Sequence, residues 1–500
     1  MKKIILRLLQ VILLVILVIV AINVLEPLRP VKLSEENRAV AEETVQEIRE
    51  AMGPDAEPET ESSSKTGNTA EGSAKDQTAA LKDKERIACI DDNKEALVLR
   101  LRMIEAAKES LVFATFDFRA DESGSAMMAA FYAAAERGVK VSLLLDGMNE
   151  FLYLERSELF KALCTHENVE VRVYNPIDAF HILKGNYRMH DKYLITDDTM
   201  YLLGGRNSND IFLGDRKTGI NADREIFVYE PEKGNGKSFQ ELEEYFVSIW
   251  EESCVKEKKV SMKEAKKEAA AAKLLERYQE ICEKYPELGT AADTDWTKET
   301  YPVESITLIN NGTQAAKHEP IMFYTLEKLM EEGKDIVIQT PYVIADQAMY
   351  AVMEETAEHA DVKIILNAVE KGSNPWGCTD YLNNKGKILG TGCSVYELMN
   401  EAAVHTKTIV VDDRMSIVGS YNWDMRSTYL DTELMLVIDS EELNQHLREM
   451  NAGYMEKSRE VLADGTETEG AKFQEVEMTK GKKGIYQVLR VIIRPFRHLL

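Results

Sequence analysis

Hydrophobic and polar positions follow two alternating patterns along most of the chain. Apolar residues recur at helical spacing over residues 94–110 and 123–137, and β-rich apolar runs cover 111–118, 139–145 and 169–174. The same order returns later, with helical patterns over 324–332 and 345–359 and strand patterns over 336–340, 362–366 and 394–398. This alternation predicts an α/β fold built from two similar halves, each with a mixed β-sheet flanked by helices.

The N-terminal segment has a different pattern. Residues 4–25 are apolar except for Arg7, Gln10 and Asn23, and about 20 such residues cross a bilayer. We expect residues 1–31 to form a transmembrane anchor. Lys2, Lys3 and Arg7 favour a cytoplasmic N-terminus, which places the rest of the chain on the extracytoplasmic side of the cell membrane. The alternative is a cleaved signal peptide, although the apolar run is long and no small-x-small site follows it.

Three further segments lie outside the two halves. Residues 32–85 are predicted to be an acidic disordered linker, with a helix-prone stretch at 34–52 for which Ser34 is a candidate cap. Residues 53–83 lack large apolar side chains, and some 30 flexible residues reach roughly 30 Å. Residues 256–300 are rich in Ala, Lys and Glu and have no counterpart in the second half, which indicates a helical linker or insertion.

The C-terminal tail, residues 461–500, ends in a basic amphipathic pattern. Residues 480–500 contain six basic residues and no acidic one. On a helical wheel the arginines lie opposite an apolar stripe made of Ile485, Val488, Leu489, Ile492, Phe496 and Leu499. The pattern predicts a helix lying in an anionic lipid surface, and the alternative is a helix packed on the folded α/β part of the chain.

Two stretches repeat the same polar residues at a constant offset of 215. The paired positions are His190 and His405, Lys192 and Lys407, Asp197 and Asp412, Gly204 and Gly419, and Asn207 and Asn422. One such stretch alone carries little weight. Two complete copies indicate an internal duplication that retained its polar residues.

Strand geometry predicts the chemistry of each copy. Each His-x-Lys opens an apolar, β-rich run, and side chains at i and i+2 share one face of a strand. The histidine and lysine therefore point to the same place. An asparagine after the next short strand, preceded by small residues, can approach the same ligand. A cation, an amide and a titratable imidazole together suit a phosphate group.

The doubled His-x-Lys-x4-Asp pattern, followed by Gly-x-x-Asn, resembles the phospholipase D superfamily. The run Asn422-Trp-Asp-Met-Arg-Ser427 with Thr432-Glu433, and Arg188-Met-His in the first copy, are similar to the bacterial C-type cardiolipin synthases. The likeness covers about residues 86–460. Two positions depart from the family pattern: Asp431 stands where Asn is usual, and Gly205 stands where Ser is usual.

The resemblance implies two phospholipase D-like domains, residues 86–255 and 301–460, that face each other around one shared active site. It implies a membrane-anchored phosphatidyltransferase of cardiolipin synthase type, acting on phospholipid phosphodiesters through a phosphohistidine. His190 is then the nucleophile and His405 the general acid and base, although the sequence itself is too symmetric to choose. Lys192, Lys407, Asn207 and Asn422 would hold the phosphate oxygens, and neither a metal nor a cofactor is expected.

Carboxylates complete the expected site. Glu225 and Glu433 resemble the family residues that hold the far imidazole nitrogen, and the alternative for each is an exposed strand acid. Glu225 lies 35 residues after His190 and Glu433 lies 28 after His405, so the first half carries about seven extra residues, placed within 213–222. The other expected supporting residues are Asp197 and Asp412, which would close turns, and Asp424, which with Arg426 and Ser427 would brace the second motif. Residues 116–118 and 339–342 line the pocket or pack in the core.

Charge and cysteine content narrow the alternatives. A net charge of −25 argues against a nucleic-acid partner, so a nuclease is the weaker interpretation. The expected partners are a membrane and a phospholipid such as phosphatidylglycerol. A phospholipase D hydrolase remains open because water can replace the acceptor alcohol, whereas two complete motifs argue against an inactive lipid-binding protein. The six cysteines form no CxxC pair, which argues against zinc and leaves free thiols or disulfides open. The oligomeric state is not predicted.

Overall fold

The computed structural model describes residues 7, 10–15, 17–18, 28, 31–53, 85–177, 185–231 and 236–500. Most of the predicted anchor over residues 1–31, and residues 54–84 of the linker predicted over residues 32–85, lie outside the described residues. Within the part of the chain that is described, no helix combines the length and the apolar character that a membrane span requires.

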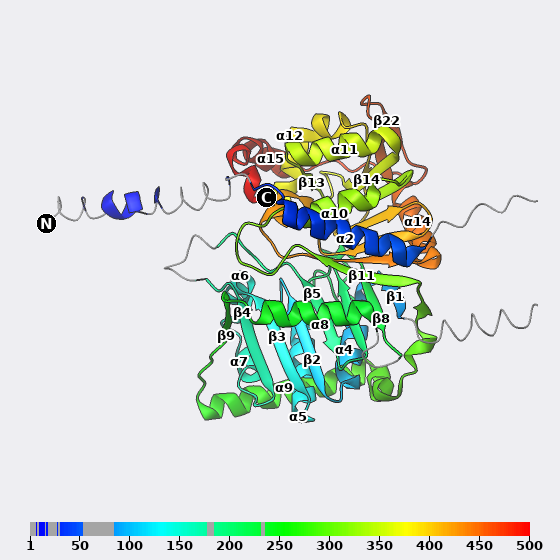
Figure 1. Cartoon of the computed structure of the whole chain (residues 1–500). Helices are drawn as coiled ribbons and strands as arrows, with labels where there is room; N and C mark the ends of the chain where they lie inside the picture. The colour runs from blue at the N-terminus through cyan, green and yellow to red at the C-terminus, as the bar shows by residue number, and fades with distance from the viewer. Residues whose placement is uncertain are drawn as a thin grey trace, which may run out of the picture.

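The first half is built on a mixed nine-stranded sheet, shown in cyan to green in Figure 1. Parallel pairing joins β2 to β3 and β3 to β4, and the other neighbours are antiparallel. In spatial order its strands are β10 (Tyr301–Pro302), β1 (Arg86–Ile90), β8 (Glu225–Tyr229), β6 (Met200–Gly204), β5 (Lys192–Thr196), β2 (Ser110–Thr115), β3 (Lys140–Asp146), β4 (Val169–Tyr174) and β9 (Val255–Glu257).

The second half repeats this topology. Its order is β11 (Ser305–Asn310), β20 (Leu434–Asp439), β18 (Met415–Gly419), β17 (Thr408–Val411), β12 (Asp335–Gln339), β14 (Asp361–Asn367), β15 (Ser394–Leu398), β21 (Ser458–Val461) and β22 (Glu467–Glu469). The run β8-β6-β5-β2-β3-β4 corresponds strand by strand to β20-β18-β17-β12-β14-β15. The predicted α/β class and the duplication are therefore confirmed.

Helices cover the outer face of each sheet and close both ends of the interface. In the first half they are α4 (Asn93–Ala106), α5 (Glu122–Glu136), α6 (Gly147–Asn149), η1 (Glu150–Leu154), α7 (Glu158–Leu163), α8 (Lys237–Trp250), α9 (Glu264–Lys284), η3 (Pro286–Asp293) and η4 (Trp296–Lys298). In the second they are α2 (Glu35–Met52), α10 (Ile321–Met330), α11 (Gln347–His359), α12 (Pro375–Leu389), α13 (Met425–Tyr429), α14 (Glu441–Met455), α15 (Lys480–Ile492) and η5 (Arg494–Leu499).

The inner faces of the two sheets share one apolar core. Side chains alternate along each strand, so Leu194 of β5 faces the outer core while Tyr193 faces the other sheet. On the inner side, Tyr193 belongs to the same cluster as Val410 of β17 and Val418 of β18. The two halves therefore face each other, and residues at the ends of β5 and β17 are brought together between them.

The prediction of a disordered linker is wrong for residues 35–52, although the helix-prone pattern and the Ser34 cap expected there are confirmed. These residues form α2, whose N-cap Ser34 accepts a hydrogen bond from the backbone of Asn37 at 3.2 Å. Val45 and Ile48 are buried against the second half, and Arg38 donates to the hydroxyl of Tyr324 on α10 at 3.0 Å. An apolar stripe on an acidic helix is enough to dock it, as the blue helix across the second half shows (Figure 1).

The helical insertion over residues 256–300 belongs to the first half. β9 pairs with β4, α9 packs against α5 and α7, and β10 pairs with β1. Ala270, Leu274 and Ile281 are the buried residues of α9. The Ala-rich stretch is therefore a covering layer of the first half rather than a free linker, and the first sheet ends at Pro302 instead of residue 255.

Candidate active site

The two His-x-Lys motifs lie at the start of equivalent strands. Lys192 is the first residue of β5, and Lys407 directly precedes β17. Each lysine Nζ donates to the backbone carbonyl of the histidine two residues before it. The predicted positions of these motifs at strand openings agree with the structure.

Backbone pairing crosses between the halves beside each histidine. The amide of His190 donates to the carbonyl of Thr432 at 3.2 Å, and the amide of His405 donates to the carbonyl of Ala222 at 2.7 Å. The second contact extends a short parallel pair between β7 (Asn221–Ala222) and β16 (Ala403–Val404). Each histidine is thus fixed by the strand that carries the carboxylate of the opposite half.

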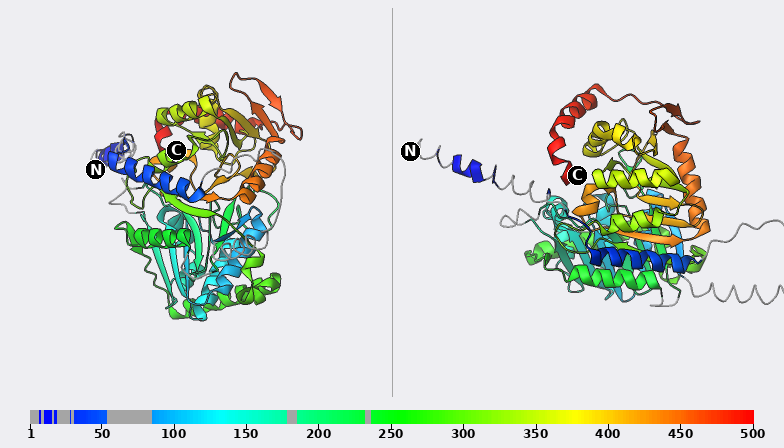
Figure 2. Two further views of the ribbon diagram at one scale, coloured as in Figure 1. Left: turned by 45° about the vertical axis from the view of Figure 1, so that its right-hand side comes forward. Right: turned by 45° about the horizontal axis from the view of Figure 1, so that its top comes forward.

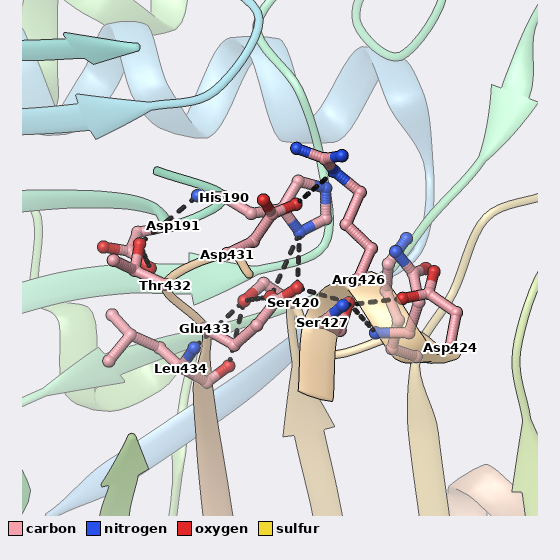
Figure 3. A network of polar contacts seen from close by, with 12 residues as sticks. His190, Asp191, Ser420, Asp424, Arg426, Ser427, Asp431, Thr432, Glu433 and Leu434 are labelled. Carbon is pink, nitrogen blue, oxygen red and sulfur yellow. Dashed lines mark hydrogen bonds and ion pairs between the residues drawn. The ribbon is translucent and has the colours of Figure 1, made fainter. Parts of the chain in front are cut away.

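Glu433 holds His190 across this boundary (Figure 3). Nδ1 of His190 lies 3.0 Å from both carboxylate oxygens of Glu433. The same carboxylate accepts from Ser427 Oγ at 2.5 Å and from Ser420 Oγ. These contacts fix the carboxylate in place. A donating Nδ1–H leaves the lone pair of Nε2 free for chemistry.

Asp223 holds His405 in the reciprocal arrangement. Its Oδ2 lies 2.7 Å from Nδ1 of His405, and the side chain is fully buried. The backbone register explains why: Gly205 donates to Arg224 as Ser420 donates to Leu434, so Asp223 is the equivalent of Glu433. A Cβ at Gly205 would lie only 2.6 Å from Asp223 Oδ1, which accounts for Gly where Ser is usual.

The prediction for Glu225 is therefore wrong. Its carboxylate pairs with Arg100 and with Arg206, the latter at 3.2 Å, and all three side chains are buried. Glu225 neutralises two buried guanidinium groups and contacts neither histidine in the part of the chain described. The correct residue, Asp223, lies 33 residues after His190, so the first half carries five extra residues instead of seven. The sequence signal for this assignment was only that an acidic residue, Asp223, stands two positions before Glu225.

The two lysines are buried with few compensating charges. Lys192 is 2% and Lys407 1% exposed. Burial, opposed by Glu433, lowers the pKa of Lys192 to about 7. Burial, opposed by Asp223, lowers the pKa of Lys407 to about 8. An anionic ligand would favour the charged form of both, so this arrangement suits a phosphate.

Both histidines favour the neutral form. Burial, together with the charges of Lys192 and Lys407, holds the pKa of His190 well below its ordinary value. Burial and Lys407, whose Nζ lies 3.1 Å from Nε2 of His405, lower the pKa of His405 to about 4. Burial opposes ionisation of Asp223, yet Lys407 and His405 bring its pKa below the ordinary range. A neutral imidazole is the form that can attack or accept a proton.

A cavity of about 290 Å³ contains both histidines. It is lined by Phe116, His190, Asn207, Tyr342, Ile344, Asn374, Trp376, His405, Asn422, Asp424, Arg426, Asp431, Leu499 and Leu500. Within the described residues, the side-chain oxygens of Asn207 and Asn422 have no hydrogen-bond partner. Both amide oxygens are therefore available to accept a hydrogen bond from a ligand.

The remaining predicted residues support the site from outside the pocket or at its rim. Asp197 and Asp412 adopt positive φ values of 49° and 48°, and each accepts backbone N–H groups at the start of the neighbouring strand, β2 or β12. Asp424 caps α13 through Ser427 N at 2.6 Å. These placements agree with turn closure and bracing of the second motif.

Arg426 and Asp431 form an ion pair at the pocket rim, with Arg426 Nε 2.9 Å from Asp431 Oδ2 (Figure 3). Burial raises the pKa of Asp431 to about 7, although Arg426 opposes the rise. The Asp in place of the usual Asn therefore neutralises the nearby guanidinium.

Aromatic residues separate into pocket and core. Phe116 lies edge-on to His190 with ring centroids 5.0 Å apart, and Tyr342 also lines the cavity. Phe118 and Gln339 are buried away from it. Phe212, which the sequence patterns did not single out, contacts His405 in the same edge-on manner at 5.0 Å.

The described residues contain one cluster with the geometry of a metal site: Cys89, Asp91 and His446. None of the three lines the cavity. Arg224 Nε lies 2.8 Å from Asp91 Oδ1, so the guanidinium group already neutralises the carboxylate of this cluster. The six cysteines are free thiols.

Several known proteins are similar to this chain in sequence or in fold. The family model described as "Cardiolipin synthase, PLD-like domain" matches residues 101–250 and 326–452, more than half of the chain. Cardiolipin synthase C of Escherichia coli K12 is 25% identical over 71% of this chain and 82% of its own length. Cardiolipin synthase 1 of Staphylococcus epidermidis is 25% identical over 77% of this chain and 70% of its own. The crystal structure of phosphatidylserine synthase from Haemophilus influenzae superposes with a TM-score of 0.57 at 16% identity, over 86% of this chain and all of that one, which shows a common fold.

Proposed function

The chain belongs to the cardiolipin synthase family with phospholipase D-like domains and is a phosphatidyltransferase of that superfamily, and on this premise we propose that it joins two phospholipid molecules into cardiolipin. The donor is a phosphatidyl group such as that of phosphatidylglycerol, and the acceptor is the free hydroxyl of a second lipid. The single observation that carries the proposal is the crossed pair of contacts, Glu433 to His190 and Asp223 to His405.

The geometry supports a two-step mechanism. In both rings Nδ1 faces a carboxylate, so Nε2 is the nitrogen directed toward substrate. Lys407 Nζ also lies against the ring of His405, 2.7 Å from Nδ1 and 3.1 Å from Nε2, and would turn to the phosphate when substrate binds. Nε2 of His190 attacks phosphorus and the P–O bond to the leaving alcohol breaks, while His405 gives that oxygen its proton. His405 must enter this step as the imidazolium, a form that Asp223 and the negative charge of the bound phosphodiester favour against burial and Lys407. The acceptor hydroxyl then loses its proton to His405, attacks phosphorus and releases His190. Atoms and charge balance without any other reactant.

The lysines and asparagines have the charge and position to stabilise five-coordinate phosphorus. Lys192 and Lys407 provide two ammonium groups in a buried site, where electrostatic stabilisation is stronger than in water. Asn207 and Asn422 add amide donors from the turns after β6 and β18. Which histidine attacks rests on the family resemblance, since both rings have an equivalent carboxylate.

Membrane attachment is part of the proposal. The apolar run over residues 4–25 would anchor the chain with its N-terminus in the cytoplasm, leaving the catalytic halves on the extracytoplasmic side. Residues 54–84 would then serve as a tether. The docked helix α2 shortens that tether relative to the predicted 32–85, because residues 35–52 belong to the catalytic body.

Labelled phosphatidylglycerol tests the reaction. Full-length protein in vesicles is expected to convert it to cardiolipin with release of glycerol. Added glycerol should drive the reaction backward and lower the yield of cardiolipin. Other small alcohols should be incorporated into phosphatidyl products. Phosphatidic acid as the only product, even at high alcohol concentration, would assign the protein as a phospholipase D hydrolase instead.

A further inference from the structure

Exposed apolar side chains border the catalytic pocket on the second half. α15 packs on α12 through the buried Tyr486, and η5 begins after the buried Ile493. Leu489 of α15 is partly buried against the same core, whereas the remaining apolar side chains of the helix are exposed, Val491 by 68%. The exposed set is Ile485, Val488, Val491 and Ile492. A surface helix normally buries its apolar stripe against the protein. The exposed apolar side chains of α15 therefore call for a partner outside the described residues.

Three sectors run along α15. Tyr486, Leu489 and Ile493 face the body of the protein. Ile485, Val488 and Ile492, spaced i, i+3 and i+7, form the exposed apolar sector. The exposed basic residues between and beside these sectors are Lys480, Lys483, Arg490 and Arg494. The two alternatives for the tail are therefore combined: the helix is packed on the domain and still presents an amphipathic outer surface.

The first half contributes a matching feature. Three consecutive side chains of η1, Phe151, Leu152 and Tyr153, are exposed, Leu152 by 59%. Asp146 caps the preceding turn at Met148 N and pairs with Arg188 at 3.0 Å, two residues before His190. A short π-helix is an uncommon element and often marks a functional site. Here it presents apolar side chains next to the first motif.

Both features lie at the same end of the molecule. Figure 1 shows α6, from which η1 continues, on the same side as α15 and the C-terminus, and Figure 2 shows the red C-terminal segment curving along the second half to that end. Leu499 and Leu500, which follow α15, line the cavity with His190. Trp376 joins them, being half-exposed and part of the same lining. The cavity lining therefore reaches the C-terminal segment that follows α15, at the end of the molecule where α6 also lies.

We propose that this docking face, made of η1 residues 151–153, Trp376 and the exposed apolar sector of α15, rests on an anionic lipid bilayer. Charge selects this occupant: the chain carries −25 overall, yet residues 480–500, which include α15, have six basic residues and no acidic one. Apolar side chains beside exposed lysines and arginines match the interface of an anionic membrane. The arrangement presents the pocket mouth directly to the lipid headgroups.

The docking face would keep the catalytic pocket close to its lipid substrate. Its relevance to lipid turnover rests on the proposed function. The proposed tether over residues 54–84 would leave the catalytic body free to move roughly 30 Å from its anchor. Two apolar contacts, one from each half, would hold the pocket mouth at the membrane surface in one orientation. The same contacts would counter the repulsion between an acidic protein and an anionic bilayer.

Tryptophan quenching by brominated lipid tests the proposal without depending on turnover. The chain has four tryptophans and none precedes Trp250. In full-length Trp376→Phe protein reconstituted in phosphatidylglycerol vesicles, Phe151→Trp and Val488→Trp are made separately. Both new tryptophans should lose much of their emission when the acyl chains are brominated, and less so in neutral phosphatidylcholine vesicles.

Leu275→Trp in the same background is the matched control, since Leu275 is an exposed apolar residue of α9 on the outer side of the first half. It should not be quenched. Absence of quenching at position 151 or at position 488, or equal quenching at 275, would overturn the proposal. Crosslinking between copies at 151 and 488 in place of quenching would assign the face to self-association. Failure of the protein with its original tryptophans to make cardiolipin, with quenching intact in the variants, would overturn the proposed function alone.

Discussion

The carboxylate of Glu433 lies 3.0 Å from Nδ1 of His190, although 243 residues separate the two along the chain. The reciprocal contact joins Asp223 of the first half to His405 of the second at 2.7 Å. Each half thus supplies the group that orients the imidazole of the other. Neither half has a complete catalytic unit of its own.

The role of Asp223 can be separated from that of Glu225 by mutation. Asp223→Asn should lower kcat by on the order of 10²- to 10⁴-fold, because His405 loses the charge that stabilises its protonated form. Its melting temperature should also fall, because a buried charge that faces Lys407 and His405 is lost, so rates are compared per folded fraction. Steady-state rates and thermal unfolding of the purified variants measure both effects.

Glu225→Gln is the matched control. It removes the charge that faces Arg100 and Arg206, and breaking a buried ion pair costs about 3–5 kcal/mol of stability. The free energy of unfolding should fall while the folded fraction retains its kcat. If instead Glu225→Gln lowered kcat and Asp223→Asn did not, the assignment of the two carboxylates would be reversed.

Gly205→Ser introduces the side chain that is usual in related motifs. Its Cβ would approach Asp223 Oδ1 to 2.6 Å, so the carboxylate must move away from His405. Activity should drop roughly tenfold, corresponding to about 1.4 kcal/mol. The double variant Gly205→Ser, Asp223→Gly should not fall further than Asp223→Gly alone. Full activity of Gly205→Ser would mean that Asp223 is not held where the structure has it.

The pH dependence follows from the lysines. The pKa values of Lys192 and Lys407 are lowered to about 7 and 8, so their positive charges are present at low pH and disappear as pH rises through these values. kcat/KM, which reports the free enzyme, should therefore decline above about pH 7. A bound phosphodiester stabilises the ammonium forms, so the alkaline limb of kcat should lie at higher pH. Identical alkaline limbs for the two parameters would contradict this account.

Chelation should leave the reaction intact. Lys192 and Lys407 provide the positive charge that a metal ion would otherwise supply at phosphorus. Rates measured after dialysis against EDTA should equal those of untreated protein. Loss of activity that zinc or magnesium restores would show that the lysines are insufficient.

Much of this architecture follows from sequence periodicity. The alternation of helical and strand patterns predicts two similar α/β halves, and a constant offset of 215 identifies the duplicated site residues. The two-residue period of a strand is enough to predict that His190 and Lys192 point to the same face of β5. These inferences are local, which is why they agree with the fold.

The differences arise where tertiary contacts decide. Counting along the chain favoured Glu225, but the register between β6 and β8 places Asp223 opposite His405. Acidic composition before residue 86 suggested a linker that is free of the folded halves. In the structure, Ala41, Val45 and Ile48 are buried and hold one face of α2 against the second half. The wheel of α15 identified an apolar stripe but could not show that Tyr486 and Ile493 turn toward the body.

The shared site is the central claim, and the turnover of three variants tests it most directly. His190→Ala and His405→Ala should each lower kcat by roughly three orders of magnitude or more, and the double variant should be no slower than either, because groups that act as one unit are not additive. Labelled phosphatidylglycerol in vesicles provides the readout, with circular dichroism to verify folding. If each single variant instead retained about half of the activity and only the double variant were inactive, the two motifs would be independent sites and the account would be contradicted.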